Sequence, residues 1–286
     1  MRLSVVDEDG FAILPREIGD LVDLIVDSER GLDRVSQSLP NCEVITPTEV
    51  EVLAPLQRFR RDILCTGLNY SDHFEEGIGL RGDYEVDRPE HPTFFTKGPD
   101  TVIGPYDDIC FDPSLSQRWD YEAEIALVIG VAGRSIAESE AMSHVWGFTL
   151  ANDITQRDVQ RAHGGQWLKG KSVDNTMPIG PWMVTRDEID LDNVQLECRL
   201  NGETMQSASL SQMEFKVPRL LAELSWGMTL RPGDLLLTGT PSGVGHARVP
   251  QIYLSAGDEL VVTATGMGEL RNEIAEGSLT EYQLFS

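Results

Sequence analysis

From Arg61 onward, the chain is a series of short β-like runs separated by glycine and proline. Turn signals such as Gly104-Pro105 bound these runs, and helical patterns are limited to residues 70–76, 153–162 and 216–228. The main β-like runs are residues 63–66, 93–96, 125–129, 182–184, 235–238 and 260–264. Because these strands do not alternate regularly with helices, the pattern argues against a parallel doubly wound sheet. We therefore expect an α+β fold that is mainly β, with antiparallel or mixed sheets.

The first sixty residues differ from the rest of the chain. They hold short apolar runs, many acidic residues and a proline-punctuated stretch from Pro47 to Pro55. A chain of 286 residues allows one sizeable core plus a modest appendage. We expect a small N-terminal subdomain and connector over residues 1–60, followed by a larger domain over residues 61–286.

The charge balance excludes several classes of partner. Lys and Arg number 23 and Asp and Glu number 47, so the net charge is 23 − 47 = −24. Such a surface repels phosphate backbones and anionic lipids, so we expect no nucleic-acid partner and no membrane partner. The opening residues do not form a secretory signal, and no apolar run is long enough to span a membrane. The four cysteines form no CxxC pair, which favours reduced thiols in a cytoplasmic protein.

The strongest chemical signal is a pair of carboxylates at the start of an apolar run. Glu122 and Glu124 stand two residues apart, so on a strand they share a face with Ala126 and Val128. Two adjacent carboxylates near an apolar sheet repel each other and suffer desolvation, and a hard divalent cation removes both problems. Oxygen-only ligands favour Mg²⁺, Mn²⁺ or Ca²⁺ over zinc. The alternative is a strand end whose two acids face water.

Two further groups have both a chemical and an ordinary interpretation. Asp153 follows an apolar run and could be a third carboxylate ligand, but Asp at the start of a helical pattern commonly serves as an N-cap. His73 and Glu76 are three residues apart, which makes them neighbours on a helix. A carboxylate that orients an imidazole makes it a better base for activating water, whereas the alternative is an ordinary surface pair.

Residues 165–172 match the P-loop pattern, but their context argues against a nucleotide site. A P-loop needs a hydrophobic strand before it and a helix that starts at the lysine. Here the preceding residues are polar, and Pro178 and Pro181 prevent a long helix. Lys171 could still reach a site as a lone cation. Residues 238–245 predict a strand running into a glycine-rich turn, which either offers amides and hydroxyls to a carboxylate or is simply a tight turn.

Taken in order, these motifs closely resemble the fumarylacetoacetate hydrolase family. The resemblance covers roughly residues 61–275 and rests on chained motifs. They are GLNY with His73 and Glu76, PTFFTK, DYEAE, NDITQRD, KSVD, and PGD followed by TGTPSGVG. The resemblance implies a mixed β-sandwich roll, often behind a small N-terminal domain, and a homodimer.

The resemblance also implies roles for individual residues. Glu122, Glu124 and Asp153 match the carboxylates that hold the divalent metal. His73 and Glu76 match the dyad that activates water in the hydrolytic members.

The remaining matched residues are expected around the substrate. Lys171 matches the active-site lysine of the family. Residues at positions that contact the carboxylate or keto oxygens of a substrate are Arg157, Gln160 and Thr240. Tyr70 and Lys97 are expected to line the pocket.

The expected activity is that of a metal-dependent hydrolase. It would cleave a C–C bond in a small keto-acid substrate, a 2,4-diketo acid such as an acylpyruvate or a diketo-deoxy sugar acid, to give pyruvate and a carboxylic acid. The expected cofactor is Mg²⁺ or Mn²⁺, with Ca²⁺ able to take its place. The alternative is a decarboxylase of the oxaloacetate type, or an isomerase or lyase on an unsaturated keto-dicarboxylate, because the same enolate chemistry serves all of them. The segment 77–91 follows the dyad directly and is expected to act as a lid.

Overall fold

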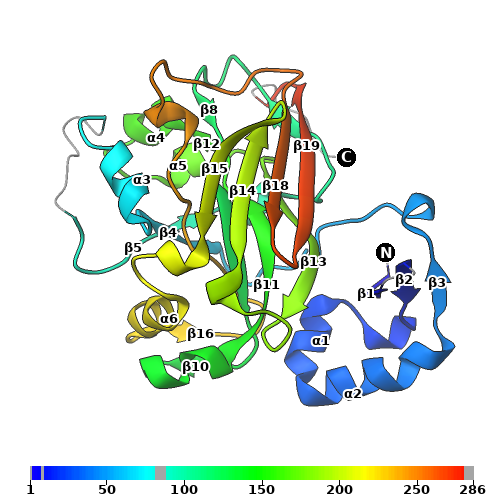
Figure 1. Cartoon of the computed structure of the whole chain (residues 1–286). Coiled ribbons are helices and arrows are strands. Elements are labelled where there is room, and N and C mark those ends of the chain that lie inside the picture. The colour runs from blue at the N-terminus through cyan, green and yellow to red at the C-terminus, as the bar shows by residue number, and fades with distance from the viewer. Residues whose placement is uncertain (1, 8–9, 81–87, 280–286) are drawn as a thin grey trace.

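The computed structural model describes residues 2–7, 10–80 and 88–279 (Figure 1). Its centre is a seven-stranded mixed sheet in which the two parallel pairs are β4 with β17 and β6 with β13. In spatial order its strands are β5 (Thr93–Lys97), β4 (Ile63–Gly67), β17 (Leu235–Leu237), β9 (Ala123–Ile129), β11 (Val145–Asn152), β13 (Met177–Thr185) and β6 (Val102–Ile103).

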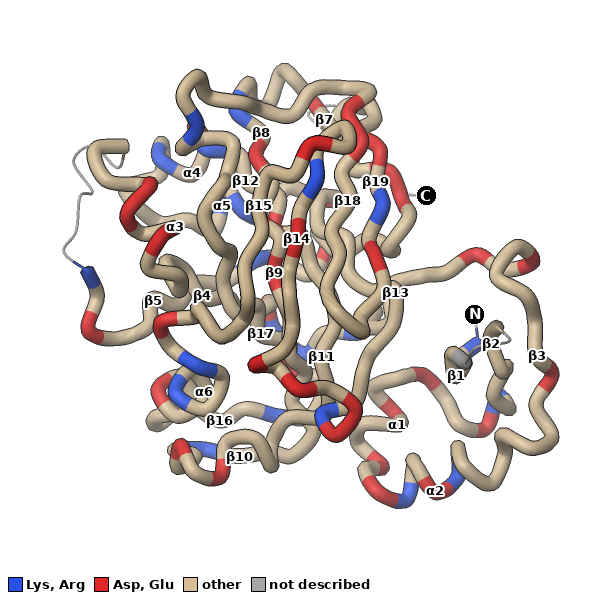
Figure 2. Tube along the Cα trace, in the orientation of Figure 1, with Lys and Arg blue, Asp and Glu red and all other residues tan. Residues whose placement is uncertain are grey.

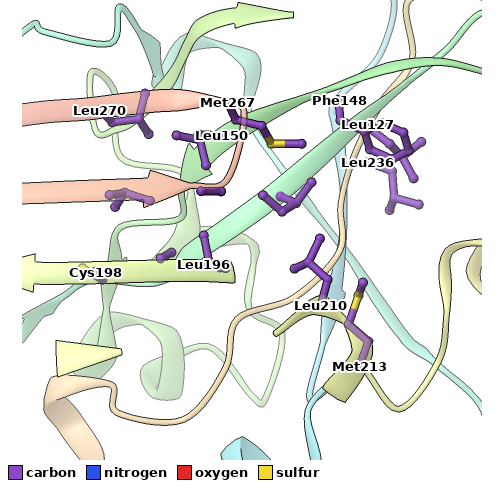
Figure 3. Packing of buried hydrophobic residues seen from close by; sticks show 14 of the residues in the cluster. Leu127, Phe148, Leu150, Leu196, Cys198, Leu210, Met213, Leu236, Met267 and Leu270 are labelled. Carbon is purple, nitrogen blue, oxygen red and sulfur yellow. The ribbon is translucent and has the colours of Figure 1, made fainter. Parts of the chain in front are cut away.

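A second, five-stranded sheet packs against the first. In spatial order its strands are β15 (Glu203–Ser209), β14 (Gln195–Leu200), β18 (Glu259–Ala264), β19 (Gly268–Glu276) and β7 (Ile109–Phe111). The main apolar core lies between the two sheets, where Leu127 and Phe148 of the first sheet and Leu196 and Leu270 of the second belong to one buried cluster (Figure 3). The expected mainly β fold with a mixed sandwich is confirmed.

Strand β9 is buried on both faces, which explains its unbroken apolar sequence. Ile125 and Leu127 belong to the cluster between the sheets, whereas Ala126 and Val128 belong to a second cluster on the opposite face. Side chains on a strand alternate between faces, so an apolar residue is needed at every position. Glu124 precedes Ala126 on the face of the second cluster.

The second cluster also contains N-terminal residues, among them Leu14 and Ile25. This part of the chain folds into a small three-stranded sheet and two helices, drawn in blue at the lower right of Figure 1. Its elements are β1 (Ser4–Asp7), β2 (Gly10–Ile13), α1 (Leu21–Asp27), α2 (Glu29–Ser38) and β3 (Glu43–Ile45). The N-terminal residues therefore complete the burial of one face of the large sheet.

The remaining elements are short. They are α3 (Ser71–Glu76), α4 (Arg157–Ala162), α5 (Leu168–Lys171), α6 (Val217–Ser225), the pair β8 (Trp119–Asp120) and β12 (Thr155–Gln156), and the pair β10 (Gly133–Arg134) and β16 (Thr229–Leu230). Five of the six predicted β-like runs lie within strands, the run 235–238 extends one residue beyond β17, and two predicted helices correspond to α3 and α6. No helix in the described ranges is long and apolar enough to cross a membrane.

The helix predicted over residues 153–162 is shorter than expected. It begins only at Arg157, and Gln156 is its N-cap residue. Thr155 and Gln156 instead pair with β8, because Thr155 lies opposite Asp120 and Gln156 opposite Trp119. Asp153 therefore caps no helix, which removes the ordinary interpretation of its position.

Candidate metal centre and active site

Three buried carboxylates meet where β9 begins and β11 ends. These two strands are antiparallel, with Ala123 opposite Asn152, so the residue before one strand lies beside the residue after the other. The Asp153 amide donates to the Glu122 carbonyl oxygen at 2.8 Å and fixes this approach. One carboxylate oxygen from each of Glu122, Glu124 and Asp153 lies within 4.8 Å of the others.

Three buried cations surround the triad. Lys171 Nζ donates to Glu122 Oε2 at 2.7 Å and to Asp153 Oδ2 at 2.8 Å. Lys97 Nζ donates to Asp153 Oδ1 at 2.8 Å. Arg157 forms an ion pair with Glu122 at 2.7 Å and another with Asp120 at 2.8 Å. Glu124 forms an ion pair with none of the described cations, and one of its oxygens accepts a hydrogen bond from the Gly239 amide at 2.6 Å.

The charges at this centre do not balance. Buried carboxylates are Asp120, Glu122, Glu124 and Asp153, and buried cations are Lys97, Arg157 and Lys171, so 3 − 4 leaves one negative charge. Burial raises the pKa of Glu122, but Lys171 and Arg157 outweigh this effect and bring the pKa to about 2. Burial raises the pKa of Glu124 well above its usual value, and repulsion from Asp153 and Glu122 adds to the rise.

This excess of negative charge fits a divalent cation. Glu124 is a buried carboxylate that forms no ion pair with any cation in the described part of the chain. The atoms that Glu122, Glu124 and Asp153 offer to a metal are all carboxylate oxygens. Oxygen-only ligand sets suit hard cations such as Mg²⁺, Mn²⁺ and Ca²⁺. The triad can therefore hold a divalent metal ion, as the sequence predicted.

The His73–Glu76 pair lies on α3 and is anchored to the rest of the site. His73 Nδ1 and Glu76 Oε1 are 2.7 Å apart, and their side chains are only 13% and 19% exposed. The second oxygen of Glu76, Oε2, accepts a hydrogen bond from the Gly243 amide at 2.7 Å. His73 also lowers the pKa of Glu122, so its imidazole lies within electrostatic range of the triad. The pair is therefore not an ordinary surface pair.

The glycine-rich turn after β17 holds both groups in place. Gly239 and Gly243 have φ angles of 99° and 104°, a backbone region that favours glycine. A Cβ on Gly243 would lie 2.0 Å from the Met205 carbonyl oxygen, and one on Gly239 would lie 2.8 Å from Asn69 Cβ. The amide of Gly239 binds Glu124 and that of Gly243 binds Glu76, so this turn positions a metal-ligand candidate and the dyad together.

The residues predicted to contact a substrate have varied environments. The Thr240 hydroxyl donates to the Ala123 carbonyl at 2.9 Å and accepts from Gln206 Nε2 at 2.8 Å, so protein groups already engage it. Gln160 is partly buried on α4, where its backbone packs against Gly170 of α5. Tyr70 is fully buried, and its hydroxyl has no hydrogen-bond partner among the described residues.

Lys97 and Asp120 make more buried contacts at the site than the sequence motifs indicated. Lys97 was expected to line the pocket, but its ammonium group is fully buried against Asp153 and the Ile154 carbonyl. Asp120 received no role from the sequence, although it begins the DYEAE motif. Its carboxylate pairs with Arg157 and accepts hydrogen bonds from the amides of Gly245 and His246. Its position directly before the carboxylate pair was the only available signal.

Two other sequence predictions concern the P-loop-like segment and the expected lid. Lys171, in the P-loop-like segment, ends the four-residue helix α5 and points into the carboxylate triad, which agrees with rejection of a nucleotide site. The predicted lid over residues 77–91 lies partly outside the described residues, since 81–87 are not described. On its C-terminal flank, Arg88 contacts Ser71 and Glu214.

Comparison with known proteins identifies the family. The sequence model described as fumarylacetoacetate (FAA) hydrolase C-terminal matches residues 62–275. The chain belongs to the fumarylacetoacetate hydrolase family. As a member of this family it is similar to the oxaloacetate tautomerase YisK of Bacillus subtilis (strain 168), with 39% identity over 90% of this chain and 86% of the relative.

Other family members point to related reactions. The mitochondrial oxaloacetate tautomerase FAHD2A of Bos taurus is 39% identical over 95% of this chain and 84% of the relative. Among solved structures, a maleylpyruvate hydrolase from Sphingobium sp. SYK-6 in complex with manganese(II) and pyruvate has a TM-score of 0.80 and 25% identity, covering 97% of both chains. Family membership is therefore shown. The similar proteins include both tautomerases and a hydrolase.

Proposed function

We propose that this protein is a divalent-metal-dependent tautomerase that interconverts the enol and keto forms of oxaloacetate or a closely similar 2-keto dicarboxylate. The observation that carries the proposal is the similarity to two oxaloacetate tautomerases over at least 90% of this chain. The sequence alone favoured hydrolysis of a 2,4-diketo acid, and the relatives support its isomerase alternative better. The buried triad, the lysine and the dyad supply what an enolate reaction needs.

Keto–enol exchange moves one proton between C3 and the oxygen on C2. A divalent cation held by Glu122, Glu124 and Asp153 would supply Lewis-acid stabilisation of the charge on an enolate. Because His73 Nδ1 faces Glu76 Oε1, His73 Nε2 is the atom that can carry the proton. It would take the proton from C3 and release it to the oxygen on C2 when the enol forms, and reverse both transfers when the keto form is restored. Glu76 orients the imidazole and stabilises its protonated form, and the Gly243 amide in turn fixes Glu76.

Lys171 and Arg157 set the electrostatics of the same reaction. Both cations are buried and both contact Glu122, so they place positive charge beside the reacting centre without relying on solvent. Charges fixed in a buried site stabilise developing negative charge more than they would in water. We propose Mg²⁺ or Mn²⁺ as the physiological metal, supported for manganese by the similar maleylpyruvate hydrolase.

Hydrolysis of an acylpyruvate is the second candidate. The anchored His73–Glu76 dyad favours it, because a base oriented by a carboxylate can activate water as well as accept a proton from carbon.

A homodimer and a cytoplasmic location stay predictions from the sequence.

The decisive experiment compares the two reactions on one preparation. Decay of the enol form of oxaloacetate is followed by ultraviolet absorbance with Mn²⁺ or Mg²⁺, with EDTA, and with Glu124→Gln. Glu203→Gln, which removes an exposed carboxylate on β15, is the matched control. Metal-dependent acceleration that Glu124→Gln abolishes supports the tautomerase. Release of pyruvate from acylpyruvates without acceleration of enol decay would instead establish the hydrolase.

A further inference from the structure

A second arginine, Arg161, lies on the same helix as Arg157 and is the centre of a small group that includes His246 and Tyr253. Arg161 follows Arg157 by four residues, so both side chains leave one face of α4 about 6 Å apart along the helix axis. Arg161 Nη2 lies 2.6 Å from His246 Nε2, and His246 Nδ1 lies 2.6 Å from the Tyr253 hydroxyl. The amide of His246 donates to Asp120, the residue that also holds Arg157. This group is therefore connected through Asp120 and Arg157 to Glu122 of the candidate metal centre.

The positive charge of this group is not neutralised. Among the described residues, no carboxylate forms an ion pair with Arg161 or with Arg118, which lies nearby on the chain entering β8. Asp158 is directed instead to Ser116 and the Gln117 amide. In a chain of net charge −24, this concentration of arginine is unusual, and Figure 2 shows basic residues around α4, α5 and β8.

The electrostatic environment agrees with this description. Burial lowers the pKa of Arg161, and repulsion from Arg157 lowers it further. Burial and the positive charges of Arg157, Arg161 and Arg118 lower the pKa of His246 to about 4. A neutral His246 can accept a hydrogen bond from Arg161 and hold its guanidinium group in place.

Arg157 gives an independent indication that a ligand binds here. Its Nε and Nη1 atoms face Asp120 and Glu122, whereas Nη2 is buried and has no hydrogen-bond partner among the described residues. Arg157 is 7% exposed, and a buried donor without a partner carries a free-energy penalty that a bound acceptor would remove. The unpartnered N–H of Arg157 thus lies on the same helix face as Arg161, which forms no ion pair with a described carboxylate.

We propose that Arg161, held by His246 and Tyr253, binds the distal carboxylate of the substrate, and so selects 2-keto dicarboxylates over 2-keto monocarboxylates. Arg161 is a specificity-determining residue in this scheme and His246 is a positioning residue. Arg118, which is exposed, adds positive potential beside this group. The inference rests on the proposed function for the identity of the substrate, and it concerns the binding of a second carboxylate by Arg161.

The first test measures binding without turnover. Isothermal titration calorimetry of the Mn²⁺-loaded protein compares malate, which has two carboxylates, with lactate, which lacks the distal one. We expect wild-type protein to bind malate at least about tenfold more tightly, since charge-assisted hydrogen bonds are the strong ones. Arg161→Met should remove this preference and leave lactate binding unchanged. Arg199→Met, which removes an exposed arginine paired with Glu197, is the matched control.

The second test uses kinetics and addresses His246. His246→Phe should raise KM for enol-oxaloacetate about tenfold with little change in kcat, because the proton transfer is carried out elsewhere. His246→Gln, which keeps a hydrogen-bond acceptor, should restore most of the loss. A purely structural role would instead lower kcat and thermal stability in both variants.

The outcomes separate this inference from the proposed function. Loss of malate preference in Arg161→Met supports the inference even if the wild-type protein does not act on oxaloacetate, a result that would reject only the tautomerase. Equal weakening of malate and lactate, no preference in wild-type protein, or an unchanged preference in Arg161→Met would overturn the inference, whatever the catalytic activity.

Discussion

Glu76 and Gly243 are joined by a hydrogen bond of 2.7 Å from the backbone amide to carboxylate Oε2. This contact links helix α3, which carries the dyad, to the turn in which Gly239 binds Glu124. The relative placement of the proposed proton-transfer group and the candidate metal ligands therefore depends on the backbone conformation of one short turn. Its geometry can be tested without altering any catalytic side chain.

Gly243→Ala should disrupt this link. The new methyl group would meet the Met205 carbonyl, and φ of 104° strains an alanine regardless of space. We expect a loss of about 2–3 kcal/mol in the free energy of unfolding and a lower kcat. Gly202→Ala is the matched control, because Gly202 has φ of 82° but nothing within 4 Å of an added Cβ. Urea denaturation and enol-decay kinetics measure both effects, and equal losses in the two variants would contradict the prediction.

Glu124→Gln should separate stability from metal binding. The pKa of Glu124 is raised well above its usual value, first by burial, so burying this carboxyl group lowers the stability of the metal-free fold at pH values above its ordinary pKa. The neutral amide should raise the Tm of the metal-free protein by a few degrees. It should also abolish the additional rise that Mn²⁺ gives the wild-type protein. Thermal scans with Mn²⁺ and with EDTA measure both, and a lower Tm in EDTA would refute the electrostatic argument.

His73→Asn should remove proton transfer but retain metal binding. Loss of a positioned general base lowers kcat by about 10²–10⁴-fold. Calorimetric titration with Mn²⁺ should give an affinity close to that of the wild-type protein, since His73 is not one of the triad. His91→Asn is a suitable control, because His91 also pairs with a glutamate, Glu223, but is 69% exposed. A His73→Asn variant that retains wild-type kcat would exclude the proposed base.

His246 should make stability depend on pH. Its pKa of about 4 in the folded protein is below its ordinary value of 6.5, so the unfolded chain binds more protons between these values. The free energy of unfolding should therefore decrease as pH falls from 6.5 to 4 and show no further contribution from this residue below pH 4. Solvent screening limits the effect to about 1–2 kcal/mol. Urea denaturation at several pH values should show a smaller decrease for His246→Gln; curves of equal slope would contradict the assignment.

Local pattern was sufficient for part of the fold and of the site. The alternation of β9 placed Glu122 and Glu124 on one face, and the three-residue spacing of His73 and Glu76 placed them together on a helix. Both are short-range properties of regular backbone. The helices α1 and α2 were not predicted as helices, because their lengths of 7 and 10 residues make the periodic signal weak.

Other features depend on contacts between distant parts of the chain. Lys97 and Asp153 are 56 residues apart, and Gly243 and Glu76 are 167 apart, so only the sheet topology brings each pair together. Asp153 resembled an N-cap because the short pairing of β12 with β8 has no clear local signature. The reaction could not be read from the site residues, since hydrolases and tautomerases can share enolate chemistry.

Strand β9 also connects the two halves of the molecule mechanically. Glu124 belongs to the candidate metal centre, and two and four residues later Ala126 and Val128 pack in the same apolar cluster as Ile25 of α1. A strand fixed by neighbours on both sides transmits displacement along its length. We therefore expect the first sixty residues not to be a detachable module, because trimming or exchanging them would alter the support of the strand that holds a candidate metal ligand.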